Sequence, residues 1–562
     1  MNDHADLIIA NARILTMDDE NPRVDALAVA GGLIAAVGSA SQIMALRGNE
    51  TRVIDARGAS VLPGFIESHA HLFLGAAELS HLQLGGVFGL EALAERLAAY
   101  TQAHPDLPFL IGQSCDYDIL GQGQRLTRQM LDAIIPNRPV ALVAADHHTV
   151  WANTMALEMA EVLHGRELSP GNEIVMGEDG LAAGELREFE AMAPLFKAAD
   201  MERARIGLDA GTEPEDPSAD EREADKQIMR RGLAYAASFG ITSFHNMDGN
   251  LYQLDLLEEI GREGGLICRA QVPFHFKHPM TLSDLEHATT RAARYHGDWL
   301  KAGVVKLFMD GVLDSGTAHM LSPYKTGDDW RGEAYFSDEE FAQLATEIDR
   351  RGLQIAVHAI GDAAVRTVLD GYEAAARANG ARDSRHRIEH IEVTTADDIP
   401  RFSQLGVIAS MQPSHAAGAM DFPVEPTASI LGPERAPYAY APRTIRESGA
   451  HVVFSTDWPV APINPILSMQ TAMIREPWSP DLPDQRFSLL EAIHAYTVEG
   501  AYAEFAEDRK GRLKPGYFAD IVVMSNDLES LPVERLHEAE ARMTICGGRV
   551  THEREAHAKS PA

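Results

Sequence analysis

The sequence of 562 residues predicts an α/β protein: a (β/α)8 TIM-like barrel, with a small β-sandwich built from both chain ends and a long insertion after the first barrel strand. Two observations predict this fold. Short apolar runs surround a Gly-Gly pair near each end of the chain, which is a hairpin signal. Eight short apolar or β-branched runs occupy the middle, separated by segments with helical spacing, and this alternation is typical of a barrel.

The two β-rich ends are expected to pair into the small sandwich, residues 1–62 with residues 500–553. The strands expected in it are 7–15, 26–30, 33–37, 51–55, 520–524, 541–546 and 549–552. Gly31-Gly32 and Gly547-Gly548 supply the two turns. The polar residues after 553 are expected to fray.

The barrel is expected over residues 63–499. Its eight strands are expected, in order, at 65–68, 241–247, 268–274, 304–309, 354–357, 387–391, 407–411 and 451–455. Apolar residues at helical spacing, as over 338–351 and 363–376, predict helices between them. The gap from about 72 to 240 is too long for one crossover helix, so it must hold an insertion, with strands expected at 110–113 and 140–144.

The composition excludes several classes of partner. Lys plus Arg number 49 against 83 Asp plus Glu, a formal net charge of −34, which argues against nucleic acid and anionic membranes. The three cysteines are far apart without a C-x-x-C pair, so neither a disulfide framework nor a thiolate metal site is expected. The acidic start lacks a signal peptide's basic region, and no run of about 18 apolar residues occurs. We therefore expect a cytoplasmic protein acting on a small molecule.

Polar residues at the ends of the predicted strands indicate a metal site. His69 and His71 are two residues apart on a strand, so both imidazoles would face one point, an arrangement that suits zinc or a similar metal. Lys306 would lie inside an apolar strand, where an unpaired ammonium is expensive. His358, His390 and Asp457 end three more strands. Each residue alone could be structural, but six at one end of a barrel favour a metal site.

At these residues the sequence resembles the amidohydrolase superfamily, and within it the amidohydrolase 3 or YtcJ-like group. The resemblance covers nearly the whole chain and rests on motifs in family order: Pro63-Gly-Phe-Ile-Glu-Ser-His-Ala-His, Asp146-His-His-Thr-Val-Trp, Val305-Lys-Leu-Phe-Met-Asp-Gly, His358-Ala-Ile-Gly-Asp, Arg387-Ile-Glu-His, Met411-Gln-Pro-Ser-His and Ser455-Thr-Asp-Trp-Pro-Val. His147 departs from the pattern, since relatives usually have Gly there, and this departure would alter the local shape of the pocket.

The resemblance implies a ligand set. His69 and His71 with Asp457 would hold one buried divalent metal, zinc in the first instance, and His358 with His390 a second. Lys306 would bridge the two ions as its N-carboxylated form, a carbamate made from carbon dioxide. A one-metal form with unmodified Lys306 stays open, and so do manganese and iron, because both accept histidine and carboxylate ligands.

The predicted reaction is hydrolysis of a C–N bond other than a peptide bond, as in an N-formyl or N-acyl amine, by metal-activated hydroxide with Asp457 as general base and then acid. A deaminase of a heterocycle, or a lactone, carbamate or ester hydrolase, is the alternative on the same site. A metal-free binding or assembly protein is a third hypothesis, which the filled ligand positions disfavour. No residue demonstrates self-association, although a homo-oligomer is compatible with such a barrel.

Substrate contacts are predicted at four residues near the expected mouth: His148, Trp151, Asp310 and His415. Trp151 could instead pack in a core, and Asp310 and His415 could instead be turn residues. Glu188 matches a family position, but an exposed carboxylate on a helix is the simpler interpretation.

Overall fold

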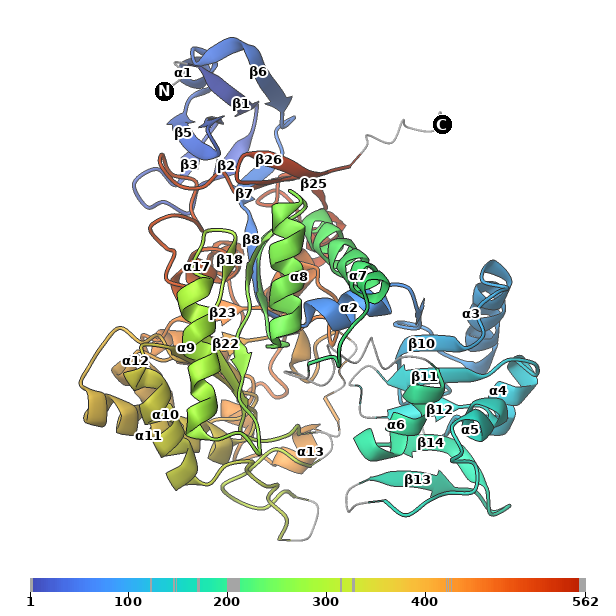
Figure 1. The fold of residues 1–562 in the computed structure, drawn as a ribbon. Helices are drawn as coiled ribbons and strands as arrows, with labels where there is room; N and C mark the ends of the chain where they lie inside the picture. The colour runs from blue at the N-terminus through green and yellow to red at the C-terminus, as the bar shows by residue number, and fades with distance from the viewer. Residues whose placement is uncertain are drawn as a thin grey trace. The chain divides into compact units, whose positions relative to one another are not determined.

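The computed structural model describes residues 4–121, 124–144, 147, 149–168, 172–199, 213–313, 316–325, 329–420, 422, 424–425 and 427–554 (Figure 1). The chain divides into two compact units. The first comprises Met1–Leu72, Ser218–Trp458 and Pro462–Ala562, and the second Phe73–Pro217 with Pro459–Ala461. All six predicted metal ligands belong to the first unit.

Strands from both ends of the chain share one sheet in the first unit. Its order is β26-β25-β24-β7-β2-β3, with β2 (Arg13–Leu15), β3 (Arg23–Val24), β7 (Ser60–Pro63), β24 (Ile521–Met524), β25 (Ala541–Cys546) and β26 (Arg549–Glu553). A second sheet, β5-β4-β1-β6, contains β1 (Ala5–Ala10), β4 (Ala26–Ala30), β5 (Leu33–Gly38) and β6 (Arg47–Asp55). Ile9 and Leu27 of the second sheet pack in one apolar core with Val61 and Ile521 of the first. Burying this shared apolar surface holds the two chain ends together.

Two parallel sheets carry the predicted ligands. One has the order β18-β16-β15-β8, with β8 (Phe65–Ala70), β15 (Ile241–Asn246), β16 (Arg269–Gln271) and β18 (Leu300–Lys301). The other has the order β17-β19-β20-β21-β22-β23, with β17 (Phe274–His275), β19 (Val304–Phe308), β20 (Gln354–Ala359), β21 (Arg387–His390), β22 (Ile408–Met411) and β23 (Val452–Phe454). Parallel strands alternating with helices make this an α/β fold, as the sequence predicts. The third expected strand is divided into β16 and β17, which belong to different sheets.

Helices connect these strands. In the first unit they are α1 (Ala40–Met44), α7 (Ala219–Ser238), α8 (Leu251–Arg262), α9 (Leu285–Arg294), α10 (Asp338–Arg350), α11 (Asp362–Asn379), α12 (Ile399–Leu405), α13 (Thr427–Leu431), α14 (Pro442–Glu447), α15 (Pro465–Ile474), α16 (Leu489–Ala495) and α17 (Val498–Ala503), with 3-10 turns η2 (Leu282–Asp284), η3 (Pro413–His415), η4 (Ala436–Tyr438) and η5 (Val533–Glu538). Local chemistry explains α10, which begins at a capping box between Ser337 and Glu340. It buries Phe341, Leu344 and Ile348, which share one face at helical spacing.

The second unit has its own sheet and core. The sheet order is β13-β14-β12-β11-β10-β9, with β9 (Leu82–Gln83), β10 (Leu110–Cys115), β11 (Val140–Ala144), β12 (Thr149–Ala152), β13 (Glu173–Met176) and β14 (Ala182–Arg187), and the helices are α2 (Leu72–Glu78), α3 (Leu90–Ala103), α4 (Arg128–Ile134), α5 (Thr154–Met159) and α6 (Phe189–Ala198). Neighbouring residues of β11 enter two different cores, Leu142 one and Val143 the other. Helices therefore cover both faces of this sheet, and the predicted insertion is a folded unit.

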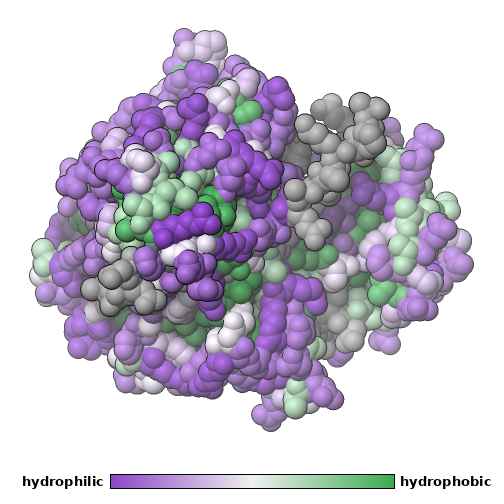
Figure 2. All heavy atoms as spheres, turned by 90° about the horizontal axis from the view of Figure 1, so that it is seen from above, coloured by the Kyte–Doolittle hydropathy of each residue, from purple (hydrophilic) through white to green (hydrophobic). Residues whose placement is uncertain are grey.

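The described residues contain no helix that is both long and apolar enough to cross a membrane. The face seen in Figure 2 is mainly hydrophilic, with apolar side chains in smaller areas between. This agrees with a chain in which 83 acidic residues outnumber 49 basic ones.

Candidate metal centre

His69 and His71 converge on one carboxylate oxygen. His69 is on β8 and His71 lies just beyond its end. Their Nε2 atoms lie 3.5 and 3.3 Å from Oδ1 of Asp457, which follows β23. Atoms that bind zinc tetrahedrally at ~2.0–2.1 Å lie roughly 3.3–3.5 Å from one another. The two distances to Asp457 therefore match those between neighbouring ligands of one metal ion.

Two buried carboxylates orient the histidines. Nδ1 of His69 lies 2.7 Å from Glu389, and Nδ1 of His71 lies 2.7 Å from Asp248. A carboxylate that accepts a hydrogen bond from Nδ1–H leaves Nε2 of a neutral imidazole bare, as a metal ligand requires. Burial lowers the pKa of His69 to about 4. For His71 the carboxylates of Asp248 and Asp457 outweigh burial and raise the pKa to about 9. The two carboxylates thus favour a positive charge at the ring of His71, next to Asp457.

A third buried carboxylate, Glu67, fixes the two ligand-bearing segments relative to each other. It accepts hydrogen bonds from the backbone N–H and the hydroxyl of Thr456, both at 3.0 Å, and from the backbone N–H of His69 at 3.2 Å. The backbone of Asp457 is left-handed (φ 58°), and so is that of His390 (φ 76°). Such conformations cost energy in residues other than glycine and persist where surrounding contacts enforce them.

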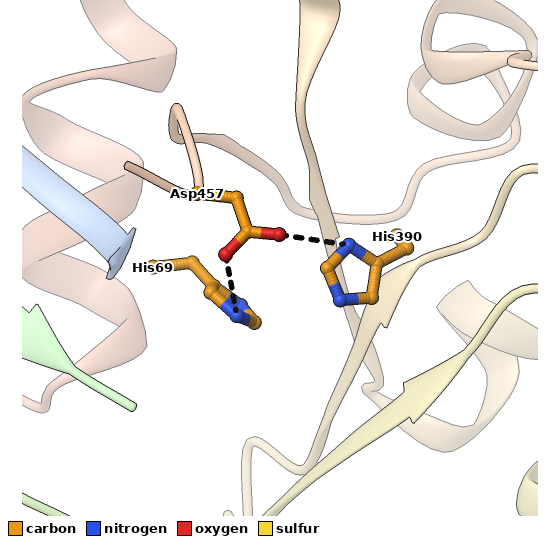
Figure 3. Close-up of side chains that lie close together, drawn as sticks. All are labelled: His69, His390 and Asp457. Carbon is orange, nitrogen blue, oxygen red and sulfur yellow. Dashed lines mark ion pairs between the residues drawn. The ribbon is translucent and has the colours of Figure 1, made fainter. Parts of the chain in front are cut away.

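His390 completes the cluster shown in Figure 3. Its Nδ1 lies 3.9 Å from Asp457 Oδ2 and 2.9 Å from the side-chain oxygen of Gln412. Among the described residues, His69, His390 and Asp457 form a group whose possible ligand atoms all lie within 4.8 Å of one another. The side chains of Asp457 and His390, which come from different segments, point toward one another in the figure.

His358 and Lys306 lie beside this cluster. The ring centroids of His358 and His390 are 4.5 Å apart. Nε2 of His358 lies 3.1 Å from the carbonyl of Gly311. Because a carbonyl only accepts, this nitrogen carries the proton and Nδ1 is the bare atom of the neutral ring. The amine of Lys306 is fully buried without a hydrogen-bond partner among the described residues, and burial lowers its pKa to about 8.

The structure gives the predicted substrate residues different surroundings. Asp310 is fully buried and accepts hydrogen bonds from three backbone N–H groups, those of His319, Ile360 and Gly361, at 2.8–3.0 Å. Its carboxylate thereby holds the segment after β19 against the end of β20. His415, in η3, stacks on His390 with the ring planes 9° apart and the centroids 6.3 Å apart. A substrate contact at either residue stays a prediction.

The other predicted contacts belong to the second unit. Trp151 is 3% exposed and packs in its core, with its ring 5.2 Å from that of Tyr117 in an edge-to-face contact. Glu188 is the residue before α6 and has a left-handed backbone (φ 62°). His148 lies outside the described residues. His147 has φ 64°, a conformation that suits the glycine of the resembling sequences, and its Nδ1 lies 3.6 Å from Glu78.

Replacing Asp248 by asparagine should weaken metal binding roughly 10- to 100-fold, because the amide no longer fixes the tautomer and orientation of His71. Competition with a chromophoric chelator measures the dissociation constant of the metal. Asp19→Asn is the control, since Asp19 is exposed and lies between β2 and β3 of the sheet that the two chain ends share. Equal affinity in the Asp248 variant and the wild type would show that His71 does not depend on this carboxylate for binding.

Comparison with known proteins places the whole chain among metal-dependent hydrolases. The profile described as "Amidohydrolase family" matches residues 52–552. YtcJ of Bacillus subtilis is 26% identical, over 96% of this chain and 98% of its own. The N-substituted formamide deformylase of Arthrobacter pascens is 25% identical, over 99% of both chains. The crystal structure of an uncharacterized metal-dependent hydrolase from Pyrococcus furiosus is 28% identical and superimposes with a TM-score of 0.68, covering 92% of this chain and 98% of that one.

Proposed function

The chain belongs to the amidohydrolase family, and on that premise we propose that it is a metal-dependent hydrolase cleaving a C–N bond other than a peptide bond, as in an N-formyl or N-acyl amine. The observation that carries the proposal is the convergence of two correctly oriented imidazoles on Asp457 Oδ1, at 3.3 and 3.5 Å. The similarity to a formamide deformylase over 99% of both chains supports the choice of bond.

The residues present fit a divalent metal. Asp457 Oδ1 is buried and makes no hydrogen bond of ordinary geometry, although two Nε2 atoms face it. His69, His71 and Asp457 would hold the ion, a donor set that suits zinc and also manganese or iron. When bound, the metal would supply a lowered pKa for water, towards ~7, and polarisation of the scissile carbonyl. Zinc is our proposal for the ion.

Lys306 fits the carbamate bridge that the resemblance implies. Its amine has no acceptor among the described residues, and its lowered pKa, about 8, increases the neutral fraction. The neutral amine would bond to the carbon of carbon dioxide and release one proton, leaving an anionic carboxylate on nitrogen. A second ion would also require His358 as a ligand. The Nε2–H group of His358 donates a hydrogen bond to the carbonyl of Gly311, so only its Nδ1 could bind that ion. The one-metal form needs no change at His358.

Asp457 is proposed to move the proton. Despite burial, the facing imidazoles of His69, His71 and His390 hold its pKa well below the usual range, so the carboxylate is ionised. It would take a proton from the attacking water as the water oxygen bonds to the carbonyl carbon. It would then give this proton to the nitrogen as the C–N bond breaks, releasing an amine and a carboxylic acid.

His415 is proposed to orient the amide. Its Nε2 lies 3.2 Å from the carbonyl of Thr456, so this nitrogen is the donor. Burial lowers the pKa of the ring, which keeps it neutral. Nδ1 is then an acceptor, suited to the N–H of an amide substrate.

We propose further that the two parallel sheets form a (β/α)8 barrel and that the chain ends form a sandwich. A parallel bridge between Ala70 and Trp458 links the end of β8 to the segment after β23. At the other gap, the edge strand β17 is separated by only two residues of the chain, Val272 and Pro273, from β16, which pairs with the edge strand β18. Both observations support closure at the two gaps between the sheets.

The proposal predicts metal-dependent release of an amine. Isolated, chelated and metal-restored protein should be compared on a panel of N-formyl amines, N-acyl amines, esters and aminated heterocycles. We expect amine release that disappears with chelation and returns with the metal. Metal-dependent ammonia release from the heterocycles alone would favour the deaminase, and activity confined to the esters would favour the ester hydrolase. No turnover by metal-loaded protein on the whole panel would contradict amide hydrolysis.

A further inference from the structure

A pocket adjoins the metal cluster within the first unit. The space in it that a water-sized group can occupy is about 20 Å³, enough for a small polar group, and it is open to solvent. His390, Gln412 and His415 line one part of it, and Tyr440, Arg475 and Gln485 line another. A molecule bound here would therefore contact a predicted metal ligand and, elsewhere along its length, a guanidinium group.

The charge of Arg475 is unbalanced. Its Nη2 donates a hydrogen bond to the carbonyl of Tyr440 at 2.6 Å. No carboxylate of the described residues lies within ion-pairing distance of it, whereas the buried Arg269 pairs with Asp520 and the buried Arg387 with Glu389. A guanidinium has five N–H donors, and because this side chain is partly exposed, those not bonded to Tyr440 are open to water or to a ligand.

Burial disfavours the charged form of Arg475, and the groups around it offset this effect only in part. Burial lowers the pKa of Arg475 to about 10, and the offsetting groups are Tyr440 and Asp484. Arg475 nevertheless stays charged at neutral pH. A desolvated cation is costly, and an anion that binds to it recovers part of that cost.

The nearby acidic and amide side chains are committed to other partners. Glu392, the carboxylate among the described lining residues, accepts a hydrogen bond from the Tyr440 hydroxyl at 3.0 Å. Asp484 pairs with Arg486 at 2.8 Å. The side-chain oxygen of Gln485 accepts from the backbone N–H groups of Arg443 and Thr444. The partner that Arg475 lacks is therefore one that the substrate can bring.

We propose that Arg475 binds a carboxylate of the substrate, so that the amide cleaved at the metal centre carries an anionic group. The inference rests on the proposed function and adds the substrate class to it. A planar guanidinium can bind a carboxylate through two parallel hydrogen bonds, which also fixes its orientation. The chain as a whole, at a net charge of −34, would repel an anion, so a cation in the pocket is what this substrate needs.

The carboxylate could belong to either side of the scissile bond, and two series of compounds distinguish these sources. N-formyl amino acids, compared with N-formyl amino acid amides, place it on the amine side. Succinamate, compared with butyramide, places it on the acyl side. Metal-loaded wild type should show at least tenfold higher kcat/KM for the charged member of one series, as expected of a charge-assisted pair worth about 10- to 100-fold in affinity.

Arg475→Gln should reduce that ratio of charged to neutral substrate to about one, and Arg475→Lys should restore part of it, because a charge-assisted pair is worth roughly 10- to 100-fold. Arg377→Gln is the matched control, since Arg377 is 75% exposed and pairs with Glu373 on α11. Thermal unfolding of each variant checks that it is folded.

Calorimetric binding of succinate and butyrate to metal-loaded protein tests the inference without turnover. We expect succinate to bind wild type at least tenfold more tightly than butyrate, and the difference to disappear in Arg475→Gln. Equal binding of the two acids to wild type would overturn the inference even if Arg475→Gln failed to fold. Metal-dependent cleavage of neutral amides without a preference for charged ones would overturn it and leave the proposed function standing. A succinate preference without any amide cleavage would support the inference and contradict the proposed function.

Discussion

Asp457→Asn is expected to retain most of the bound metal yet lose turnover by about 10²- to 10⁴-fold, the range for removal of a general acid–base group. The amide oxygen can still occupy the position of Oδ1, 3.3–3.5 Å from the Nε2 atoms of His69 and His71. It cannot accept and return a proton near neutral pH. Amine release measures turnover, and elemental analysis of the same sample measures metal content.

Asp19→Asn is again the control, and it should match the wild type in both measurements. Near-normal turnover of Asp457→Asn would contradict the proton-transfer role. Parallel loss of metal and turnover would leave Asp457 as a ligand and assign the proton to another group, with His415 as the next candidate.

Arg387→Met is expected to destabilise the protein by about 3–5 kcal/mol, because it leaves the carboxylate of Glu389 buried without its cationic partner. Arg387 and Glu389 are both 0% exposed and lie 2.8 Å apart. The guanidinium also contacts His245 Nδ1 at 3.0 Å, the Ser68 carbonyl at 2.8 Å and the Ser410 hydroxyl at 3.0 Å. Through these contacts the Arg387 side chain links its own strand, β21, to β8, β15 and β22. The fall in stability is measured as a lower urea midpoint.

The double variant Arg387→Met with Glu389→Gln isolates the charge effect. It should recover part of the lost stability, since no ionised group is left unpaired. Arg377→Met is the surface control: Arg377 is 75% exposed, and its pair with Glu373 should contribute no more than about 0.5 kcal/mol. An Arg387→Met midpoint equal to that of the control would show that Glu389 finds another partner or a proton at little cost.

Local sequence spacing was sufficient to predict the parts of the site that depend on one strand. The two-residue separation of His69 and His71 placed both Nε2 atoms near one oxygen, because strand periodicity is a local property. The position of Lys306 inside β19 likewise followed from an apolar run. The α/β fold was predictable for the same reason, from the alternation of short runs with helical spacing.

Contacts between distant segments were not predictable from the sequence. Glu389 holds His69 across 320 residues, and Glu67 holds Thr456 across 389. One signal was available: a carboxylate inside an apolar strand needs a partner, as the lysine does, and both residues fit that description. No pattern marks Arg475, because its proposed role rests on the absence of an ion-pair partner among the described residues. The insertion was expected to contain two strands, but it forms a six-stranded sheet.

The shared sheet of the two chain ends has a consequence for biosynthesis. β7 pairs with β24 through Pro63–Ile521, Leu62–Val522 and Val61–Val523, and β8, which carries the proposed ligand His69, begins two residues after β7. During translation β7 is synthesised hundreds of residues before β24, so the edge of β7 that pairs with β24 stays unpaired for most of that time. Such open edges invite pairing with other chains, and pairing across long sequence separations is slow. The strand that leads into β8 is therefore secured late, and nascent chains should depend on chaperones until then.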